Sequence, residues 1–179
     1  MSEATIDVLV VGAGFAGIGM AIQLKRSGRD SFVIIERASE VGGTWRDNTY
    51  PGVGCDIPSH LYSFSFRLNP NWSTIYASGV EIKNYLSHAV AEENLSPHLK
   101  LQTELLESRW DEDDQLWHVE TNRGNFLVRN LVLACGRLTK PRLPPVSGAM
   151  EFEGEWFHSA QWRHDVSLRG KRVGIVGSG

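Results

Sequence analysis

A glycine-rich turn between an apolar strand and an amphipathic helix constrains the fold more than any other feature of this chain. Residues 12–17 have the spacing GxGxxG and directly follow the apolar run 7–11. After the turn, apolar residues recur at helical spacing up to about Ser27. A second apolar run, residues 31–36, comes next. A strand, a glycine turn, a helix and a second strand within about 30 residues predict a βαβ unit with parallel strands.

The turn meets the context conditions of a dinucleotide-binding fingerprint. It follows a strand, it opens a helix, and an acid, Glu36, ends the next strand about 20 residues after Gly17. We expect Gly12 to make the tight turn, Gly14 to let the backbone approach a pyrophosphate, and Gly17 to let helix and strand pack closely. The N–H groups at the start of the helix would bind the phosphates. Glu36 would accept hydrogen bonds from a ribose diol, which favours FAD or NAD over NADP at this turn.

Composition and charge exclude several classes of protein. The chain has 179 residues, 41% hydrophobic and 22% charged, as expected of a soluble globular protein. Its net charge is −3 without a basic run, so we expect no nucleic-acid partner. No run approaches the ~20 apolar residues of a membrane span. Cys55 and Cys135 form no CxxC pair and residues 111–114 lack calcium-loop spacing, so we expect no disulfide, no metal and a cytoplasmic location.

The middle of the chain combines a long irregular stretch with a second helix. Residues 37–78 show little periodicity and many glycines, prolines and aromatic residues, which is typical of a functional loop region. A helix is expected from Glu81 onward, with the capping-box pattern of Ser78 and Glu81 at its start. Farther along, residues 131–136 predict another buried parallel strand.

Short β-like runs between that helix and that strand predict a small antiparallel meander. Trp110 and Trp117 face each other across its turn and are expected to form a cross-strand pair. The runs are residues 99–103, 105–110, 117–121 and 126–129.

Residues 42–66, GGTWRDNTYPGVGCDIPSHLYSFSF, are rich in aromatic residues and unlike a plain NAD-binding dehydrogenase. Gly43 and its neighbour would allow close approach of backbone to a ligand. Trp45 and Tyr62 supply flat apolar area with polar edges, suited to an aromatic ring system. Asp56 stands among apolar and small residues, where an ionised acid is costly unless paired. The segment therefore favours FAD, although an aromatic loop that only packs over the sheet edge remains an alternative.

This segment resembles the flavin-contacting motif of type I Baeyer–Villiger monooxygenases. In that family, Ala or Gly precedes GxWxxxx and then Phe/Tyr-Pro-Gly/Met-xxx-Asp. The present chain has GGTW at residues 42–45, YPG at residues 50–52 and the acid Asp56. A family strand that ends in Ala-Thr-Gly is similar to residues 134–136, where Cys135 replaces the threonine.

A second family signature, FxGxxxHxxxW followed by Pro or Asp, lies farther along the chain. It appears here as Phe152, Gly154, His158 and Trp162, and it departs from the family at Arg163. The related N- and S-oxygenating flavin monooxygenases usually close this signature with Tyr or Phe, so the tryptophan favours the Baeyer–Villiger branch. His158 would either make a structural hydrogen bond in a hinge-like linker or act directly.

The resemblance implies an FAD- and NADPH-dependent monooxygenase. Such an enzyme inserts one atom of O₂ beside a ketone carbonyl through a C4a-peroxyflavin and gives an ester or lactone. Asp56 would lie near the flavin and nicotinamide, paired with a catalytic arginine beyond residue 179, so we expect the chain alone to be inactive. The alternatives are an N- or S-oxygenating flavin monooxygenase and a non-catalytic FAD-binding fragment.

The resemblance also implies which residues contact each cofactor. Cys55 is more readily explained as a small buried thiol than as a nucleophile, because nothing nearby in the sequence would lower its pKa. The implied FAD contacts are Gly12, Gly14, Phe15, Ala16, Gly17, Glu36, Arg37, Gly43, Thr44, Trp45, Asp56, Ile57, Tyr62, Leu105 and Gly136. The implied NADP contacts are Gly54, Cys55, Gly177, Ser178 and Gly179.

The expected fold class is α/β, with one Rossmann-type domain followed by the start of another. Residues 176–179, VGSG, resemble VGAG at residues 11–14 and suggest a second dinucleotide turn. We expect residues 1–139 to form the N-terminal part of an FAD-binding domain with its meander. Residues 140–170 would be an inter-domain linker, and residues 171–179 the first strand and turn of a truncated NADP-binding domain.

Overall fold

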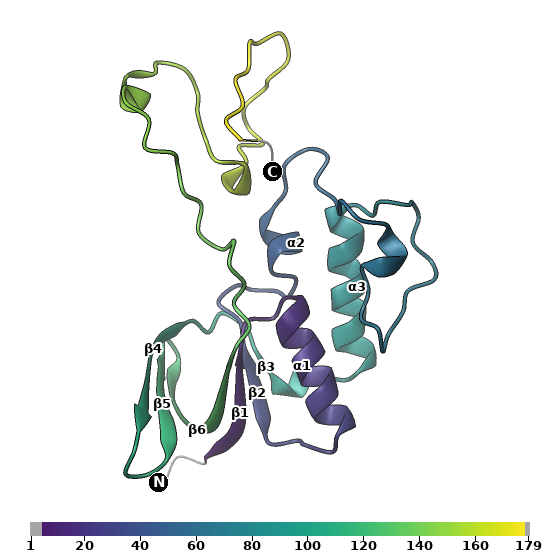
Figure 1. Ribbon diagram of the computed structural model, residues 1–179, viewed down its shortest axis with the longest axis vertical. Helices are drawn as coiled ribbons and strands as arrows, with labels where there is room; N and C mark the ends of the chain where they lie inside the picture. The colour runs from purple at the N-terminus through teal and green to yellow at the C-terminus, as the bar shows by residue number, and fades with distance from the viewer. Residues whose placement is uncertain (1–4, 178–179) are drawn as a thin grey trace.

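A computed structural model of the protein describes residues 5–177, and the strands in that range form one six-stranded mixed sheet (Figure 1). The strand order is β3-β2-β1-β6-β5-β4, which places the N-terminal strand near the middle. The helices and strands are β1 (Ile6–Val11), α1 (Phe15–Arg26), β2 (Phe32–Ile35), α2 (Thr44–Asp47), α3 (Gly79–Glu92), β3 (Leu99–Lys100), β4 (Leu105–Asp111), β5 (Leu116–Thr121) and β6 (Gly124–Leu133). Short 3-10 helices span Ser59–Leu61, Ser96–His98, Ala149–Glu151 and Ser159–Gln161.

Strand β1 is buried on both faces, as its unbroken apolar sequence predicts. It pairs in parallel with β2 on one side and with β6 on the other. Val8 and Val10 face one hydrophobic cluster, whereas Leu9 and Val11 face another. The predicted βαβ unit with parallel strands is therefore confirmed.

Two helices cover one face of the sheet, and the antiparallel strands close over the other. Ile18 and Ile22 of α1 pack with Leu86 of α3 in the cluster that contains Val10. On the opposite face Val119 of β5 packs in the cluster that contains Leu9. Both clusters contain fully buried aliphatic side chains, and each such side chain contributes about 1.5–3 kcal/mol to folding. The parallel strands and their glycine turn thus rest on a packed core.

The ends of the two long helices are fixed by specific contacts. Gly28 follows α1 with φ of +75°, a conformation that suits glycine just past a helix end. The Nζ of Lys25 donates to the carbonyl oxygens of Glu93 and Asn94, which joins the end of α1 to the end of α3. Both predicted helices are therefore present and tied together at their C-terminal ends.

The predicted capping box at the start of α3 is only half formed. The Oγ of Ser78 accepts the backbone N–H of Glu81 at 3.3 Å, as expected of an N-cap. The carboxylate of Glu81 instead accepts from the backbone N–H and the hydroxyl of Ser73. The acid therefore fixes the preceding loop and does not return to the cap.

The meander differs from the prediction in two respects. Residues 126–129 and part of 131–136 belong to one strand, β6, which pairs antiparallel with β5 and parallel with β1. Asn130 does not break this strand, because its side-chain amide donates to the carbonyl of Asp7 on β1. The run at 99–103 contributes β3, which pairs in parallel with β2 and lies outside the meander.

The predicted cross-strand tryptophan pair is confirmed. Trp110 and Trp117 lie opposite each other in the β4–β5 register, with ring centroids 5.6 Å apart. Aromatic pairs of this kind stabilise antiparallel sheets by about 0.2–1 kcal/mol. The pair fixes the register of the hairpin that carries the acidic turn 111–114.

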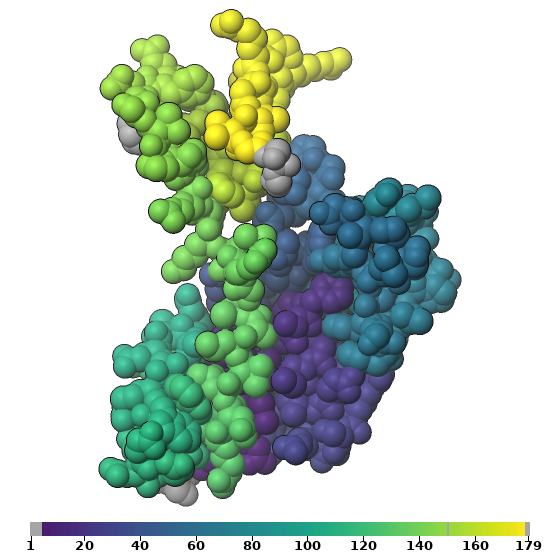
Figure 2. All heavy atoms as spheres, viewed as in Figure 1, coloured from purple at the N-terminus to yellow at the C-terminus, as the bar shows by residue number. Residues whose placement is uncertain are grey.

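After β6 the chain leaves the sheet and forms a narrow projection beyond α2 (Figures 1 and 2). The strand predicted from residue 171 is not formed in residues 171–177, and Ile175 and Val176 are 85% and 83% exposed. A strand needs hydrogen-bonding neighbours, and the six-stranded sheet does not extend to this segment. Gly177 has φ of +104°, close to +105° at Gly12, whereas Ser178 and Gly179 lie outside the described residues.

Within residues 5–177, none of the helices combines the length and apolarity that crossing a bilayer requires. The acidic turn 111–114 is exposed at the far end of the β4–β5 hairpin, apart from its first residue, which is half-buried. There Arg109 donates to Asp111 and holds the pKa of that carboxyl below its ordinary value. His118 contacts Asp114 at 2.8 Å across the same turn.

Candidate dinucleotide-binding site

The glycine turn between β1 and α1 is packed too closely for side chains at two of its positions. Gly12 has φ of +105°, and a Cβ atom there would lie 2.6 Å from the carbonyl oxygen of Ala134. A Cβ at Gly17 would lie 1.8 Å from the carbonyl oxygen of Gly12. These contacts agree with the roles expected of the first and third glycines, a tight turn and close packing of helix on strand.

Gly14 is different, because the protein itself leaves room for a side chain there. A Cβ at Gly14 would meet only the Cα of Gly43, at an ordinary contact distance of 3.6 Å. Gly14 is the N-cap of α1 and gives that helix no side-chain cap, and the first turn, which includes Phe15 and Ala16, holds no acid. The positive end of this helix therefore has neither a side-chain cap nor an acid in its first turn within the described residues, an arrangement that suits a bound phosphate.

The second glycine pair docks directly on the first turn. The backbone N–H of Gly42 donates to the carbonyl of Ala13 at 2.9 Å. A Cβ at Gly43, whose φ is +53°, would lie 3.1 Å from the Cα of Gly14. The exposed Thr44 then begins α2. Two segments that the sequence separates by about 30 residues are thus joined backbone to backbone.

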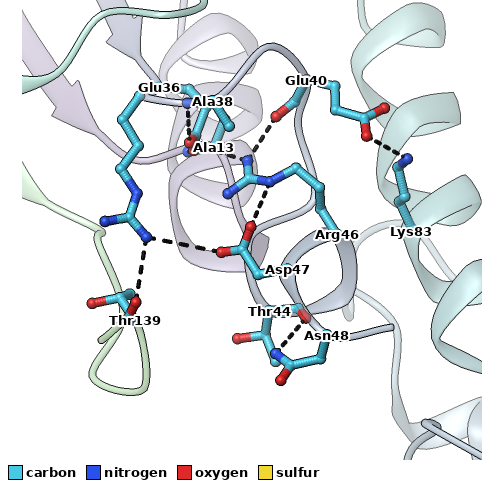
Figure 3. A network of polar contacts seen from close by, with 11 residues as sticks. Ala13, Glu36, Ala38, Glu40, Thr44, Arg46, Asp47, Asn48, Lys83 and Thr139 are labelled. Carbon is cyan, nitrogen blue, oxygen red and sulfur yellow. Dashed lines mark hydrogen bonds and ion pairs between the residues drawn. The ribbon is translucent and has the colours of Figure 1, made fainter. Parts of the chain in front are cut away.

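Glu36 lies at the centre of a polar network beside this junction (Figure 3). The residue is only 5% exposed. Its Oε2 accepts the backbone N–H of Ala13, and its Oε1 accepts that of Ala38, both at 2.9 Å. The Nη1 of Arg46 lies 3.0 Å from Oε1. The acid of the fingerprint is therefore held against the glycine turn by protein contacts.

Arg46 is the functional candidate that the sequence did not single out. Its side chain is 9% exposed; its Nε donates to Asp47 at 2.8 Å and its Nη1 to the carbonyl of Glu40 at 2.7 Å. Burial acts to lower the pKa of Arg46, but the hydrogen bond to Asp47 and the charge of Glu36 outweigh it and raise that pKa. In the family motif this position is unspecified, so no motif rule could have identified it.

The aromatic residues of the segment pack on one another next to α1. The Tyr62 ring meets Phe15 at 5.1 Å and Trp45 at 5.3 Å, edge to face in both cases. Burial is the main cause that raises the pKa of Tyr62 above its ordinary value. These contacts place three predicted FAD-binding side chains together with the glycine turn. The same rings also pack against the core, so packing explains part of their presence.

Asp56 is exposed, although its neighbours in the sequence are apolar and small. Cys55 is 7% exposed, as expected of a small buried thiol, and its backbone N–H donates to the carbonyl of Ala77. Because Cys55 points inward, Asp56 and Ile57 face outward and are exposed. A Cβ at Gly54 would lie 2.8 Å from the carbonyl oxygen of Ala77, so backbone packing alone requires this glycine.

The remaining predicted FAD contacts lie around the carboxyl ends of the strands or within the core. The Nη2 of Arg37 donates to the carbonyl of Thr139 at 3.4 Å and lies 4.0 Å from Asp47. Gly136 follows β6 with φ of +69° and is exposed. Leu105 begins β4 and packs against the cluster that contains Leu9, so its observed contacts are those of a core residue.

The second signature forms a local structure in the projection. A Cβ at Gly154 would lie 2.6 Å from the ring of Phe152, a side chain that is itself exposed. The Nδ1 of His158 accepts the backbone N–H of Ala160 at 3.0 Å, so this histidine makes the structural hydrogen bond considered above. Trp162 packs edge-on against Phe157 at 5.2 Å.

One long-range hydrogen bond joins the projection to the segment 42–66. Thr49 and His164 lie 2.9 Å apart, although 115 positions separate them in the chain. Arg163, the departure from the family signature, pairs with Asp165 and lowers the pKa of that carboxyl to about 2. The structure therefore gives Arg163 a local partner within the projection.

Comparisons with known proteins agree with this fold and site. Residues 9–179 match the family model described as pyridine nucleotide-disulphide oxidoreductase. The chain is 45% identical over 174 residues to a Baeyer-Villiger monooxygenase of Streptomyces coelicolor, covering 97% of this chain and 34% of that protein. A crystal structure of cyclohexanone monooxygenase from Rhodococcus sp. Phi1 bound to NADP⁺ matches with a TM-score of 0.85 and 37% identity. The match covers 99% of this chain and 34% of that one. The OTEMO complex with FAD and NADP matches with a TM-score of 0.83 and 33% identity, and the match covers 100% of this chain and 36% of that one.

The present chain thus spans about a third of the length of the relatives that it matches. The family model covers nearly the whole chain and includes both the glycine turn and the segment 42–66. The resemblance found from the two gapped motifs is confirmed. The chain belongs to the pyridine nucleotide-disulphide oxidoreductase family, in which it matches the N-terminal part of Baeyer–Villiger monooxygenases.

Proposed function

We propose that this chain binds FAD at the glycine turn, with the pyrophosphate at the start of α1 and the adenosine ribose on Glu36. The carrying observation is the contrast between the glycines. Gly12 and Gly17 are required by protein packing, whereas Gly14 has room for a side chain and still has none. Close approach of the protein backbone to a pyrophosphate explains why this position is glycine. The uncapped end of α1 beside Gly14 supplies the N–H donors that a pyrophosphate needs.

The residues around the turn fit the rest of an FAD molecule. Glu36 offers a buried, fixed carboxylate to ribose hydroxyls. Trp45 and Tyr62 add flat apolar surface next to the turn, suited to a planar ring system. The similar OTEMO structure is a complex with both FAD and NADP. The same cofactor pair is proposed for the whole protein to which this chain belongs.

For that whole protein we propose NADPH- and O₂-dependent insertion of oxygen beside a ketone carbonyl, giving an ester or lactone. The relatives with this name support the proposal. Bound FAD would accept the hydride of NADPH and activate O₂, while the protein orients it and excludes water. Asp56 is exposed here and is therefore available to meet nicotinamide or segments beyond this chain. Its proposed role is to support the oxidation chemistry more than to hold FAD.

We propose a division of the chain into two domains joined by a linker. Residues 1–139 would be the N-terminal part of the FAD-binding domain, 140–170 the linker, and 171–179 the start of the NADP-binding domain. The shared φ values of Gly12 and Gly177 support the second dinucleotide turn. The predicted NADP contacts at Gly54 and Cys55 have packing roles in this structure and keep only the resemblance as support.

The reaction is tested with the full-length protein, FAD and NADPH. A panel should contain cyclic ketones, thioethers and tertiary amines, with products identified by mass and NADPH consumption followed in parallel. The proposal expects ester or lactone with one added oxygen from ¹⁸O₂. Oxidation of only the thioether or amine would support the N- or S-oxygenating alternative. NADPH consumption without any oxygenated product would contradict both.

A further inference from the structure

We propose that Arg46 is a positioning residue for FAD, which fixes the Glu36 carboxylate and directs the adenosine ribose to its Oε2 atom. The inference rests on the proposed function, because it concerns the same site. It adds a residue that lies outside the glycine fingerprint and at an unspecified position of the aromatic motif. Figure 3 shows the side chains concerned, with Arg46 between Glu36, Glu40 and Asp47.

The Glu36 carboxylate has few acceptor positions that its protein partners leave open. A carboxylate offers about four lone-pair sites, two on each oxygen. Its Oε1 accepts the N–H of Ala38 at 2.9 Å and forms an ion pair with the Nη1 of Arg46 at 3.0 Å. Its Oε2 receives the N–H of Ala13 at 2.9 Å. The remaining capacity is therefore on Oε2, the oxygen that lies against the glycine turn.

Arg46 is held by two partners other than Glu36. Its guanidinium donates to the Glu40 carbonyl at 2.7 Å and to the Asp47 carboxylate at 2.8 Å, so it is anchored without help from Glu36. The side chain is 9% exposed and the Glu36 side chain 6%. Rotation of either group would leave a buried charge with fewer partners, which is costly. Arg46 is thus fixed in place and can hold the Glu36 carboxylate in one orientation.

Arg46 also places a positive charge beside the carboxylate of Glu36. The acid must carry its charge in a buried place in order to accept strongly from ribose hydroxyls. Arg46 supplies the opposite charge on the side away from Ala13. Asp47 keeps Arg46 in place and extends toward Arg37, 4.0 Å away. The acid that reads the ribose therefore depends on a second residue ten positions later in the chain.

FAD affinity in a double-mutant cycle tests this assignment. FAD is removed from the full-length protein, and the apoprotein is titrated with FAD for wild type, Arg46→Gln, Arg46→Lys, Glu36→Gln and the Arg46→Gln/Glu36→Gln pair. Hydrogen bonds to charged groups are worth about 1.5–3 kcal/mol, so Arg46→Gln should raise the Kd roughly 10- to 150-fold. Arg46→Lys should restore part of the affinity, because it keeps the charge but lacks the planar fork.

The cycle separates positioning from a merely structural role. If Arg46 acts through Glu36, then Arg46→Gln should change the Kd less than about twofold in the Glu36→Gln background. Equal fold-changes in both backgrounds would overturn the inference. A wild-type Kd in folded Arg46→Gln would overturn it as well. If Arg46→Gln fails to fold, the same cycle with Arg46→Lys decides.

A matched control and a wild-type measurement complete the experiment. Arg67→Gln removes another mostly buried arginine, 16% exposed and paired with Glu92, and should leave the Kd for FAD unchanged. A loss of affinity in Arg67→Gln as large as in Arg46→Gln would overturn the specific role of Arg46. If wild-type protein binds no FAD, the proposed function itself fails. If it binds FAD and the Arg46 variants bind FAD with the wild-type Kd, only the role of Arg46 is overturned.

Discussion

The Oε2 atom of Glu36 accepts the backbone N–H of Ala13 at 2.9 Å, inside the glycine turn itself. The acid at the end of β2 is therefore part of the architecture of the turn as well as a proposed ligand for ribose. The Ala13 carbonyl in turn accepts the N–H of Gly42, which ties the aromatic segment to the same residue. Loss of Glu36 should consequently affect the protein even before any cofactor is added.

Glu36→Ala should destabilise the apoprotein by about 1–3 kcal/mol, because the N–H of Ala13 and the guanidinium of Arg46 both lose a buried partner. Urea denaturation of apoprotein measures the change. Glu92→Ala is the control, since Glu92 is 68% exposed and its removal should cost no more than about 0.5 kcal/mol. Equal stability of wild type and Glu36→Ala would show that the acid serves the ligand alone.

The same substitution should weaken FAD binding when cofactor is present. Hydrogen-bonding partners left unpaired at the ribose cost about 1–3 kcal/mol, or roughly 5- to 150-fold in the Kd. Glu36→Gln keeps the shape of the side chain and should show most of the loss of affinity with less loss of stability. Unchanged flavin content and visible spectrum in Glu36→Ala would count against the ribose assignment.

Two glycine substitutions should separate folding from ligand binding. A Cβ at Gly17 would lie 1.8 Å from a backbone oxygen, so Gly17→Ala should cost about 3 kcal/mol or more. A Cβ at Gly14 meets only an ordinary contact, so Gly14→Ala should cost about 1 kcal/mol or less yet raise the Kd for FAD at least about tenfold. Thermal unfolding and FAD titration of both variants measure this. Tight FAD binding by Gly14→Ala would refute close ligand approach there.

Asp56→Ala should leave stability within about 0.5 kcal/mol of wild type, because Asp56 is exposed. In the full-length protein it should keep bound FAD but slow reduction of the flavin by NADPH or the oxygen insertion. Rapid mixing with NADPH, followed by product analysis, distinguishes the two steps. Normal turnover and normal coupling of NADPH to product would remove Asp56 from the oxidation chemistry.

Tyr62 should ionise at higher pH than an ordinary tyrosine. Partial burial is the main cause that raises its pKa above 10.0, so the half-buried neutral phenol stabilises the fold fully below pH 10.0. Above pH 10.0 the unfolded chain ionises first, and this stabilisation is lost as the pH rises through the folded pKa. Tyrosinate absorbance of wild type minus Tyr62→Phe gives the titration, with Tyr76→Phe as the exposed control. A midpoint at or below pH 10.0 would contradict the raised pKa of this half-buried phenol.

The local pattern was sufficient to predict the βαβ unit and its turn. Strand, turn and helix follow one another directly, so apolar spacing and the three glycines specify them without long-range information. The pairing of the strands was harder to predict than the βαβ unit. The side chain of Asn130, which interrupts an apolar pattern, reaches Asp7 on a strand 123 positions away, and no local rule reveals that bond. The same holds for β3, whose parallel partner is β2.

In the candidate site, too, local sequence predicts some residues, whereas others depend on long-range contacts. Gly12, Gly14, Gly17 and Glu36 were identified because their spacing along the chain reflects their chemistry. Arg46 was missed because its contact with Glu36 depends on how the intervening loop returns to the turn. The exposure of Asp56 depends on the long-range bond from Cys55 to Ala77, which sequence composition does not report.

The most direct test of the FAD assignment is an experimental structure of the full-length protein with FAD bound. In that structure we expect pyrophosphate oxygens within hydrogen-bonding distance, about 2.7–3.2 Å, of backbone N–H groups between Gly14 and Gly17. We also expect a ribose hydroxyl at that distance from Oε2 of Glu36, with Arg46 still on Oε1. FAD bound elsewhere, or bound here with its ribose out of reach of Glu36, would contradict the assignment of the glycine turn and Glu36 as the FAD site.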